Sequence, residues 1–271
     1  MNRIYKKFYS AFYTKTNYIP SKPLNKTLYP GDFFHIINGE MIVLGNIFSS
    51  NIVDMKNVVF EHDIKLNADS WQFSDGVSKP YSGRGTGNGA LDGVFEFSKQ
   101  ILAFETCGSF VFKSNKPEAV KIKNWNELQN ELIIKLTQTY FSFRELYLIT
   151  ETASTSDWTL AIAGAKNGEL EIAMEIENFG LVDIFGHSSS KTIQSKDIEY
   201  YNRQSERRPG FFKAKKLAEQ NESLPTFIDK LIYQRTLLNL WGKDFYKYNL
   251  DTNQKQDTTN LNNDQISILD L

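Results

Sequence analysis

Hydrophobic and polar residues alternate most regularly in the segment from Glu169 to Glu177. The apolar side chains share one face and the glutamates share the other: Leu170, Ile172, Met174 and Ile176 against Glu169, Glu171, Glu175 and Glu177. A two-residue period predicts a β-strand with one apolar and one hydrated face. Such a strand can cover a soluble core, or it can cross a membrane with its charged face toward a water-filled lumen. The pattern alone is compatible with both.

Shorter patterns predict further strands along the chain. Tyr29-Pro30-Gly31-Asp32 predicts a turn, and Asn38-Gly39 is typical of a type I′ hairpin between strands at 33–37 and 41–44. Other predicted strands lie at 58–66, 94–97, 101–104, 110–112, 145–152 and 158–163. The glycine-rich run 83–89 predicts a flexible, loosely ordered connection between two strands.

Three segments have helical spacing. Ile4, Phe8 and Phe12 lie on one stripe of a short basic, aromatic helix. Asn124 and Glu127 predict an N-cap and a capping box for a helix with Leu128, Leu132 and Leu136 on one stripe. A third helix is predicted at about 225–241, with Pro225 near its start and Gly242 just past its end. The expected class is α+β: a twisted, mainly antiparallel sheet with packing helices, as one domain at 1–248 with a tail at 249–271.

Composition favours a soluble protein of the cytoplasm. Hydrophobic residues make up 41% of the 271 residues, enough for a substantial core. No stretch approaches the roughly 18–20 uncharged apolar residues of a membrane-spanning helix. The basic start lacks the apolar core of a signal peptide, and the single cysteine, Cys107, excludes an internal disulfide.

Charge is unevenly distributed although the net charge is −1. Six basic and no acidic residues precede Gly31, whereas the segment from Asn249 carries four Asp and one Lys. A second basic cluster spans Arg203–Lys216. These clusters could face anionic lipid, or they could be solvated faces, with the first helix simply docking on the core. Candidate membrane-surface residues are Arg3, Lys6, Lys7, Phe8, Phe12, Lys15, Arg207, Arg208, Lys213, Lys215 and Lys216. Acidic residues elsewhere argue against a nucleic-acid partner.

Candidate catalytic residues are few. The histidines are His35, His62 and His187. In Glu61-His62-Asp63, neighbouring strand residues point to opposite faces, so we expect no metal site. Cys107 lies in an apolar β stretch and is expected in the core. Gly85, Gly87 and Ala90 fit G-x-G-x-x-A, but a strand instead of a helix is predicted after them. We expect no enzyme activity, metal or cofactor.

Several short motifs together resemble the pore-forming domain of gasdermins. Leu146-Tyr147-Leu148-Ile149-Thr150-Glu151 is similar to a Val-Val-Thr-Glu-like strand of that family. A strand pair at about 158–177 and the polar stretch at Lys191-Thr192-Ile193 follow it in the same order. Tyr18-Ile19-Pro20 after a basic aromatic helix resembles the start of the family's domain. The glycine-rich run lies where the first inserting hairpin would fall, and the resemblance covers about residues 1–240.

This resemblance implies a latent pore-former, monomeric until a partner protease removes an inhibitory C-terminal element. The regions at about 58–112 and 158–180 would then refold into hairpins, and many copies would close into a β-barrel in an anionic membrane, in cell death or anti-phage defence. The implied inserting residues are Leu170, Ile172, Met174, Ile176, Phe95 and Phe97, and the implied tail-docking residues are Ile266, Ile268 and Leu269. Bacterial members carry a lipid-modified cysteine near the N-terminus, and this chain departs from them because its cysteine is Cys107.

Two other functions are compatible with the residues. A soluble binding or immunity-type module would recognise another protein with its sheet. A hydrolase would depend on His62, His187 or Cys107.

Overall fold

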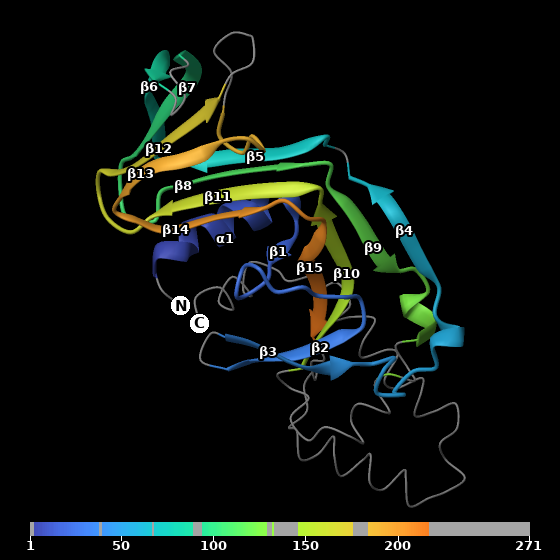
Figure 1. The fold of residues 1–271 in the computed structure, drawn as a ribbon. Helices are drawn as coiled ribbons and strands as arrows, with labels where there is room; N and C mark the ends of the chain where they lie inside the picture. The colour runs from blue at the N-terminus through green and yellow to red at the C-terminus, as the bar shows by residue number, and fades with distance from the viewer. Residues whose placement is uncertain are drawn as a thin grey trace, which may run out of the picture. The chain divides into compact units, whose positions relative to one another are not determined.

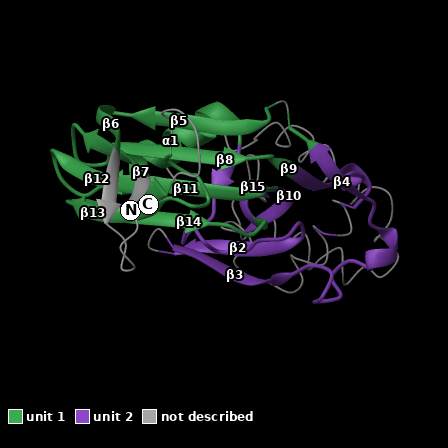
Figure 2. Cartoon of the chain, turned by 45° about the horizontal axis from the view of Figure 1, so that its top comes forward, with its two compact units in different colours: residues 1–17, 65–118, 154–208 green, residues 18–64, 119–153, 209–271 purple. Residues whose placement is uncertain are grey.

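The computed structural model describes residues 3–37, 40–66, 68–88, 94–128, 132, 146–175 and 184–216. The chain divides into two compact units, each assembled from separated segments (Figure 2). Unit 1 comprises residues 1–17, 65–118 and 154–208, and unit 2 comprises residues 18–64, 119–153 and 209–271.

Unit 1 contains one described helix and two four-stranded antiparallel sheets (Figure 1). The helix is α1 (Arg3–Thr16). The strands of the first sheet, in spatial order, are β14 (Ile198–Gln204), β11 (Asp157–Ala163), β8 (Phe110–Asn115) and β5 (Ser70–Asp75). Those of the second are β13 (Lys191–Lys196), β12 (Gly168–Glu175), β7 (Val94–Phe104) and β6 (Val77–Asn88).

Unit 2 is built on a seven-stranded sheet in the described part of the chain. Its main path is β1 (Ile19–Pro20), β15 (Arg208–Lys216), β10 (Tyr147–Thr155), β2 (Asp32–Ile37) and β3 (Glu40–Asn46). Off this path, β9 (Glu118–Ile122) pairs with β10 and with β4 (Phe60–Lys65). A 3-10 helix, η1 (Met55–Asn57), precedes β4.

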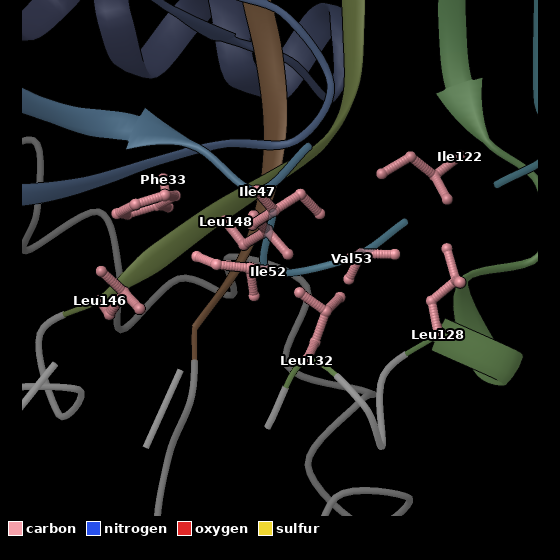
Figure 3. Close-up of a cluster of buried hydrophobic side chains, with 9 residues drawn as sticks. All are labelled: Phe33, Ile47, Ile52, Val53, Ile122, Leu128, Leu132, Leu146 and Leu148. Atoms are coloured by element: carbon pink, nitrogen blue, oxygen red, sulfur yellow. The ribbon is translucent and has the colours of Figure 1, made fainter. Parts of the chain in front are cut away.

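A hydrophobic core cluster of unit 2 contains side chains from several of these elements (Figure 3). Phe33 from β2 and Leu148 from β10 meet Ile47 and Ile52 from the chain after β3, and all four are at most 5% exposed. Burying a side chain of this size contributes about 1.5–3 kcal/mol. This cluster therefore fixes the hairpin of β2 and β3 against β10.

The expected antiparallel sheet is confirmed, and the described residues are more β-rich than the expected α+β class. The predicted strands at 33–37, 41–44, 58–66 and 158–163 correspond to β2, β3, β4 and β11. The helix predicted at the start of the chain is α1, which extends to Thr16.

The glycine-rich run was wrongly predicted as a loose connection. β6 continues through it to Asn88 and pairs with β7 from Val77↔Phe104 to Asn88↔Val94. Glycine lowers strand propensity because it has no side chain to pack, but the backbone ladder with β7 does not require side chains.

Asn124 occupies the predicted N-cap position and its side chain donates to Glu127 Oε2 at 3.2 Å, but the side-chain-to-backbone hydrogen bonds of a capping box are not formed. The Asn124 side chain accepts from the Val59 amide at 2.9 Å and donates to the Asn57 carbonyl at 2.8 Å, so it holds the entry to β4. The amide of Glu127 donates to the backbone carbonyl of Asn124 at 3.0 Å instead. The helix nevertheless starts at residue 125.

Some predicted features lie outside the described residues: Asn38-Gly39, Leu136, the helix at 225–241 and the tail with its docking residues. Within the described part of the chain, no helix is long and apolar enough to span a membrane.

Candidate membrane-inserting sheet

The two sheets of unit 1 are halves of one sheet that folds at a corner. Each strand of the first sheet continues into the strand at the same position of the second: β5 into β6, β8 from β7, β11 into β12 and β14 from β13. The outer strands pass the corner through the single residues Gly76 and Asp197. The central strands pass it through residues 105–109 and 164–167.

Each of the four passages contains a residue with left-handed backbone geometry. The φ angles are 61° at Gly76, 80° at Gly108, 60° at Asn167 and 54° at Asp197. Such a residue turns the chain sharply, and Gly and Asn or Asp accept it at the lowest cost. The corner is therefore a property of the backbone at four aligned positions.

The two central strands keep one register across the corner. β11 pairs with β8 up to Ile162↔Phe110, and β12 pairs with β7 from Gly168↔Phe104. Six positions separate the two pairs on each strand, so the register is the same on both sides of the corner. One backbone hydrogen bond continues the ladder, from the Ala163 amide to the Ser109 carbonyl at 2.9 Å, and the Ala163 carbonyl accepts from the Gly108 amide at 2.8 Å, so the ladder bulges by one residue at the corner.

The outer strands change register at the same place. Asp75 pairs with Phe110, but Val77 pairs with Phe104, four residues beyond the partner that continuation would give. On the other edge, Ile198 pairs with Ala163 and Lys196 with Glu169, again a jump of four. The central pair is thus the part of the folded sheet that could become straight without re-pairing.

In the folded state, apolar side chains are buried on different sides of the two sheets. Phe8 and Phe12 of α1 pack against Phe112 of the first sheet, with ring centroids 5.6 and 5.3 Å away, Phe8 in a tilted and Phe12 in an edge-on arrangement. The opposite face of that sheet meets the second sheet in a separate cluster. The described members of this cluster are Leu102, Phe104, Val111, Ala161, Ala163, Leu170, Ile172, Ile184 and Phe185.

Continued straight, the central strands would carry the large apolar side chains of the second sheet and those of the first sheet that α1 covers on one face. Alternation puts even-numbered residues of both strands together, because even residues pair with even residues. The large apolar side chains on this face are Leu102, Phe104, Phe110, Phe112, Trp158, Leu160, Ile162, Leu170, Ile172 and Met174; the polar residues Ser98 and Gln100 lie on it as well. The charged even-numbered residues of the central strands are Glu96, near the start of β7, and Lys166, within the corner.

The odd-numbered face of the same strands carries most of their charged residues, together with apolar residues that include Phe97, Ile101 and Val111. Its charged residues are Lys99, Glu105, Lys113, Asp157, Glu169, Glu171 and Glu175. Lys99 and Glu171 form an ion pair of 2.6 Å between neighbouring strands. Lys191 of β13 lies 3.8 Å from Glu175, an exposed contact that contributes little in water.

The predicted inserting residues divide between these faces. Leu170 and Ile172 are buried, and Met174 is half-buried on the same face. Phe97 does not join them: it pairs with Glu175 and therefore shares the odd-numbered face. The side chain of Phe95 and all of Ile176 lie outside the described residues.

The predicted membrane-surface residues of α1 are arranged differently from the expectation. Phe8 and Phe12 are 1% and 0% exposed, so in this conformation neither can contact a membrane. Lys6, Lys7 and Lys15 are exposed. The side chain of Arg3 is not among those described.

The second basic cluster is engaged by protein groups. In unit 1, Arg207 pairs with Glu118 at 3.0 Å and also donates to the carbonyls of Ser154 and Lys116. Arg208 pairs with Glu206 at 2.6 Å. The contacts of Arg207 were not predictable from the run of charges, because its partners are distant in sequence. The side chain of Lys216 is not described.

In unit 2, Lys213 and Lys215 lie over the rings of Tyr18 and Trp125, at 4.4 and 5.1 Å from the ring centroids. Lys213 also pairs with Glu151 at 3.0 Å, and the Tyr18 hydroxyl donates to the same carboxylate. Burial, with Glu151 beside it, raises the pKa of Tyr18 well above its ordinary value. Glu151 belongs to the motif at 146–151, but this cluster was not predicted because Tyr18 and Lys213 are distant from it in sequence.

Cys107 was wrongly predicted as a core residue. It is exposed and lies in the turn of the corner between β7 and β8, where the chain leaves both ladders. His62 is also exposed. His187 Nδ1 accepts a hydrogen bond from the backbone amide of Ser189 in the same turn. The described residues contain no group of three or more His, Cys, Asp or Glu that could hold a metal ion.

No protein-family model and no curated protein matches the chain.

Proposed function

We propose that this protein is a latent pore-former of the gasdermin type. Before activation it is a monomer in the cytoplasm, restrained by its tail at 249–271. A partner protease removes the tail, and the released chains assemble on an anionic membrane into a β-barrel. Neither an enzyme activity nor a cofactor belongs to this proposal. Cell death or defence against phage is the role that fits such a pore.

One observation carries the proposal: the central strands share a register across the corner and carry large apolar side chains on one face and most of their charged residues on the other. Straightening them would pair residues 97–115 continuously with residues 157–175. A tilted strand needs about 9–11 residues to cross a bilayer. At about 3.3 Å per residue, the central strands are long enough to cross and to project beyond it.

The folded state explains how such a sequence can stay in water. The corner turns the apolar face of the second sheet onto the first sheet, and α1 covers the apolar face of the first. Opening the corner in water would expose both faces, at a cost of about 25 cal/mol per Å² of apolar surface. A membrane removes this cost because the apolar face then contacts lipid. Every backbone N–H and C=O group in lipid must be paired, so the strands of many copies have to close into a barrel.

Dye release from vesicles with anionic lipid tests the proposal. The full-length chain is compared with a chain cut after Tyr248. The proposal predicts release by the cut chain alone. If the cut chain stays monomeric and leaves the vesicles intact, the proposal is wrong.

A pair of neighbouring substitutions separates membrane insertion from folding. Met174 and Ala173 are both half-buried, but they lie on opposite faces of β12. Met174→Glu would place a carboxylate on the lipid face and should lower release by the cut chain at least about ten-fold. Ala173→Glu would add the same group to the odd-numbered face and should leave release within about two-fold. Equal effects of the two substitutions would contradict the assigned faces.

A second candidate function is a soluble protein-binding module. It is supported by exposed apolar side chains on β2 and β3: Ile37, Ile42 and Leu44 are 46%, 41% and 41% exposed. β3 ends the described path of the sheet, so a partner strand could add to it. This function predicts that cutting the tail is harmless and that one partner protein co-purifies from the native host.

A further inference from the structure

A single lysine of α1 contacts two strands at the corner. Lys7 Nζ donates to Thr106 Oγ1 at 3.0 Å and lies 3.2 Å from Asp75 Oδ2. Asp75 is the last residue of β5, directly before Gly76. Thr106 lies in the turn that joins β7 to β8. One ammonium group therefore bridges the outer strand and its central neighbour where both change direction.

The groups around this lysine are closely packed. Ser109 is fully buried, and its hydroxyl lies 3.0 Å from that of Thr106. A Cβ on Gly76 would lie 2.4 Å from Ser109 Oγ, and a Cβ on Gly108 would lie 3.0 Å from the carbonyl oxygen of Ile4. The first turns of α1 thus pack directly on the corner.

The bridge fits the folded corner and is lost in a straight sheet in which the outer strand keeps its register with β8, the strand on which α1 packs; the register of β6 with β7 would instead set Asp75 opposite Thr106. If the outer strand continued in its present register with β8, Lys79 would face Thr106, four residues beyond Asp75. Four residues of strand span about 13 Å. The ammonium of Lys7 could then contact Asp75 or Thr106 but not both. An interaction present in one state and absent in the other shifts the equilibrium between them.

We infer that Lys7 acts as a clasp that stabilises the folded corner and opposes its straightening. Its effect on pore formation rests on the proposed function, but its effect on the corner does not. Lys7 and Asp75 have side chains 45% and 53% exposed, so water weakens their attraction. We expect opening of the corner to become about two- to five-fold more frequent without the clasp, as is typical of exposed ion pairs.

Hydrogen exchange on the full-length chain in solution tests the clasp. The Glu105 amide donates to Gly76 at 2.9 Å, and the Gly108 amide donates to Ala163 at 2.8 Å, so both report on the corner. Asp75→Asn keeps the charge of Lys7, whereas Lys7→Met removes the ammonium. Each should speed exchange at both amides by about two- to five-fold.

The ion pair of Lys121 with Glu61 supplies a matched control. Its length is 3.1 Å and its side chains are 39% and 42% exposed, close to the values of the clasp, but it lies in unit 2. Lys121→Met should leave exchange at the corner unchanged. Unchanged corner exchange in Asp75→Asn and Lys7→Met would overturn the clasp, and so would an equal increase in the control.

The exchange experiment tests the clasp and the vesicle experiment tests the proposed function, and either can be contradicted without the other. If exchange rises as expected but the chain cut after Tyr248 releases no dye, the clasp stands and the proposed function is wrong. If the cut chain releases dye but corner exchange does not respond, the proposed function stands and the clasp is wrong. A Lys7 that only binds lipid predicts lower release by cut Lys7→Met with normal corner exchange, which also overturns the clasp.

Discussion

At the scale of single residues, the cluster of Tyr18, Glu151 and Lys213 holds the sheet of unit 2 together. The carboxylate of Glu151 on β10 accepts from Tyr18, beside β1, and pairs with Lys213 on β15. Lys213 also lies over the ring of Tyr18. Because each group contacts the other two, the cluster fixes β15 between β1 and β10.

This cluster makes the stability of unit 2 sensitive to alkaline pH. The pKa of Tyr18 is raised by burial first and by Glu151 second, above its value of about 10 in an unfolded chain. The folded protein therefore holds this proton more tightly than the unfolded chain does. The stabilisation is complete below about pH 10 and is lost as the pH rises further.

Tyr18→Phe tests this account. At about pH 8 the substitution should lower the free energy of unfolding of unit 2 by about 1–2 kcal/mol, because one hydrogen bond to a carboxylate is lost. Above about pH 10 the difference from the unchanged protein should shrink. Urea unfolding at about pH 8 and about pH 11, followed by amide exchange in unit 2, measures both. A difference that grows with pH would contradict the assigned direction.

At the scale of elements, the corner is the feature that sequence patterns did not predict. Alternation located the strands at 94–97, 101–104 and 110–112, because local spacing decides which residues can form a strand. It did not predict that β7 and β8 are halves of one folded strand, because the pairing partners lie far along the chain. Glycine in β6 suggested a loop, whereas its ladder with β7 determines the structure.

Gly76→Ala should weaken the corner specifically. Its φ of +61° disfavours any side chain, and the added Cβ would lie 2.4 Å from Ser109 Oγ. We expect a loss of about 1–2 kcal/mol in the folded state. An extended strand has no such strain, so the chain cut after Tyr248 should release dye faster.

Gly210→Ala is the control for Gly76→Ala, because its added Cβ would meet no atom closer than 3.8 Å. It should leave the release rate nearly unchanged. Slower release by Gly76→Ala than by the control would contradict a corner that has to open.

At the scale of the whole molecule, the two units contain different kinds of sheet. Unit 1 has a folded sheet whose central strands could lengthen in register. The seven-stranded sheet of unit 2 pairs segments that are far apart in the sequence, such as those of Ile19 and Phe212. Charge patterns predicted exposed basic residues on α1, but they could not predict that Arg207 and Lys213 have acidic partners from other strands. Such pairs depend on tertiary contacts.

The most direct test of the central claim is the environment of each face of β12 at a membrane. With Cys107 replaced by Ser, single cysteines at Met174 and at Ala173 carry a polarity-sensitive dye in the chain cut after Tyr248. On vesicles with anionic lipid, the account predicts that the dye at 174 enters an apolar environment while the dye at 173 stays in water. An unchanged signal at 174, or the same change at both positions, would contradict it.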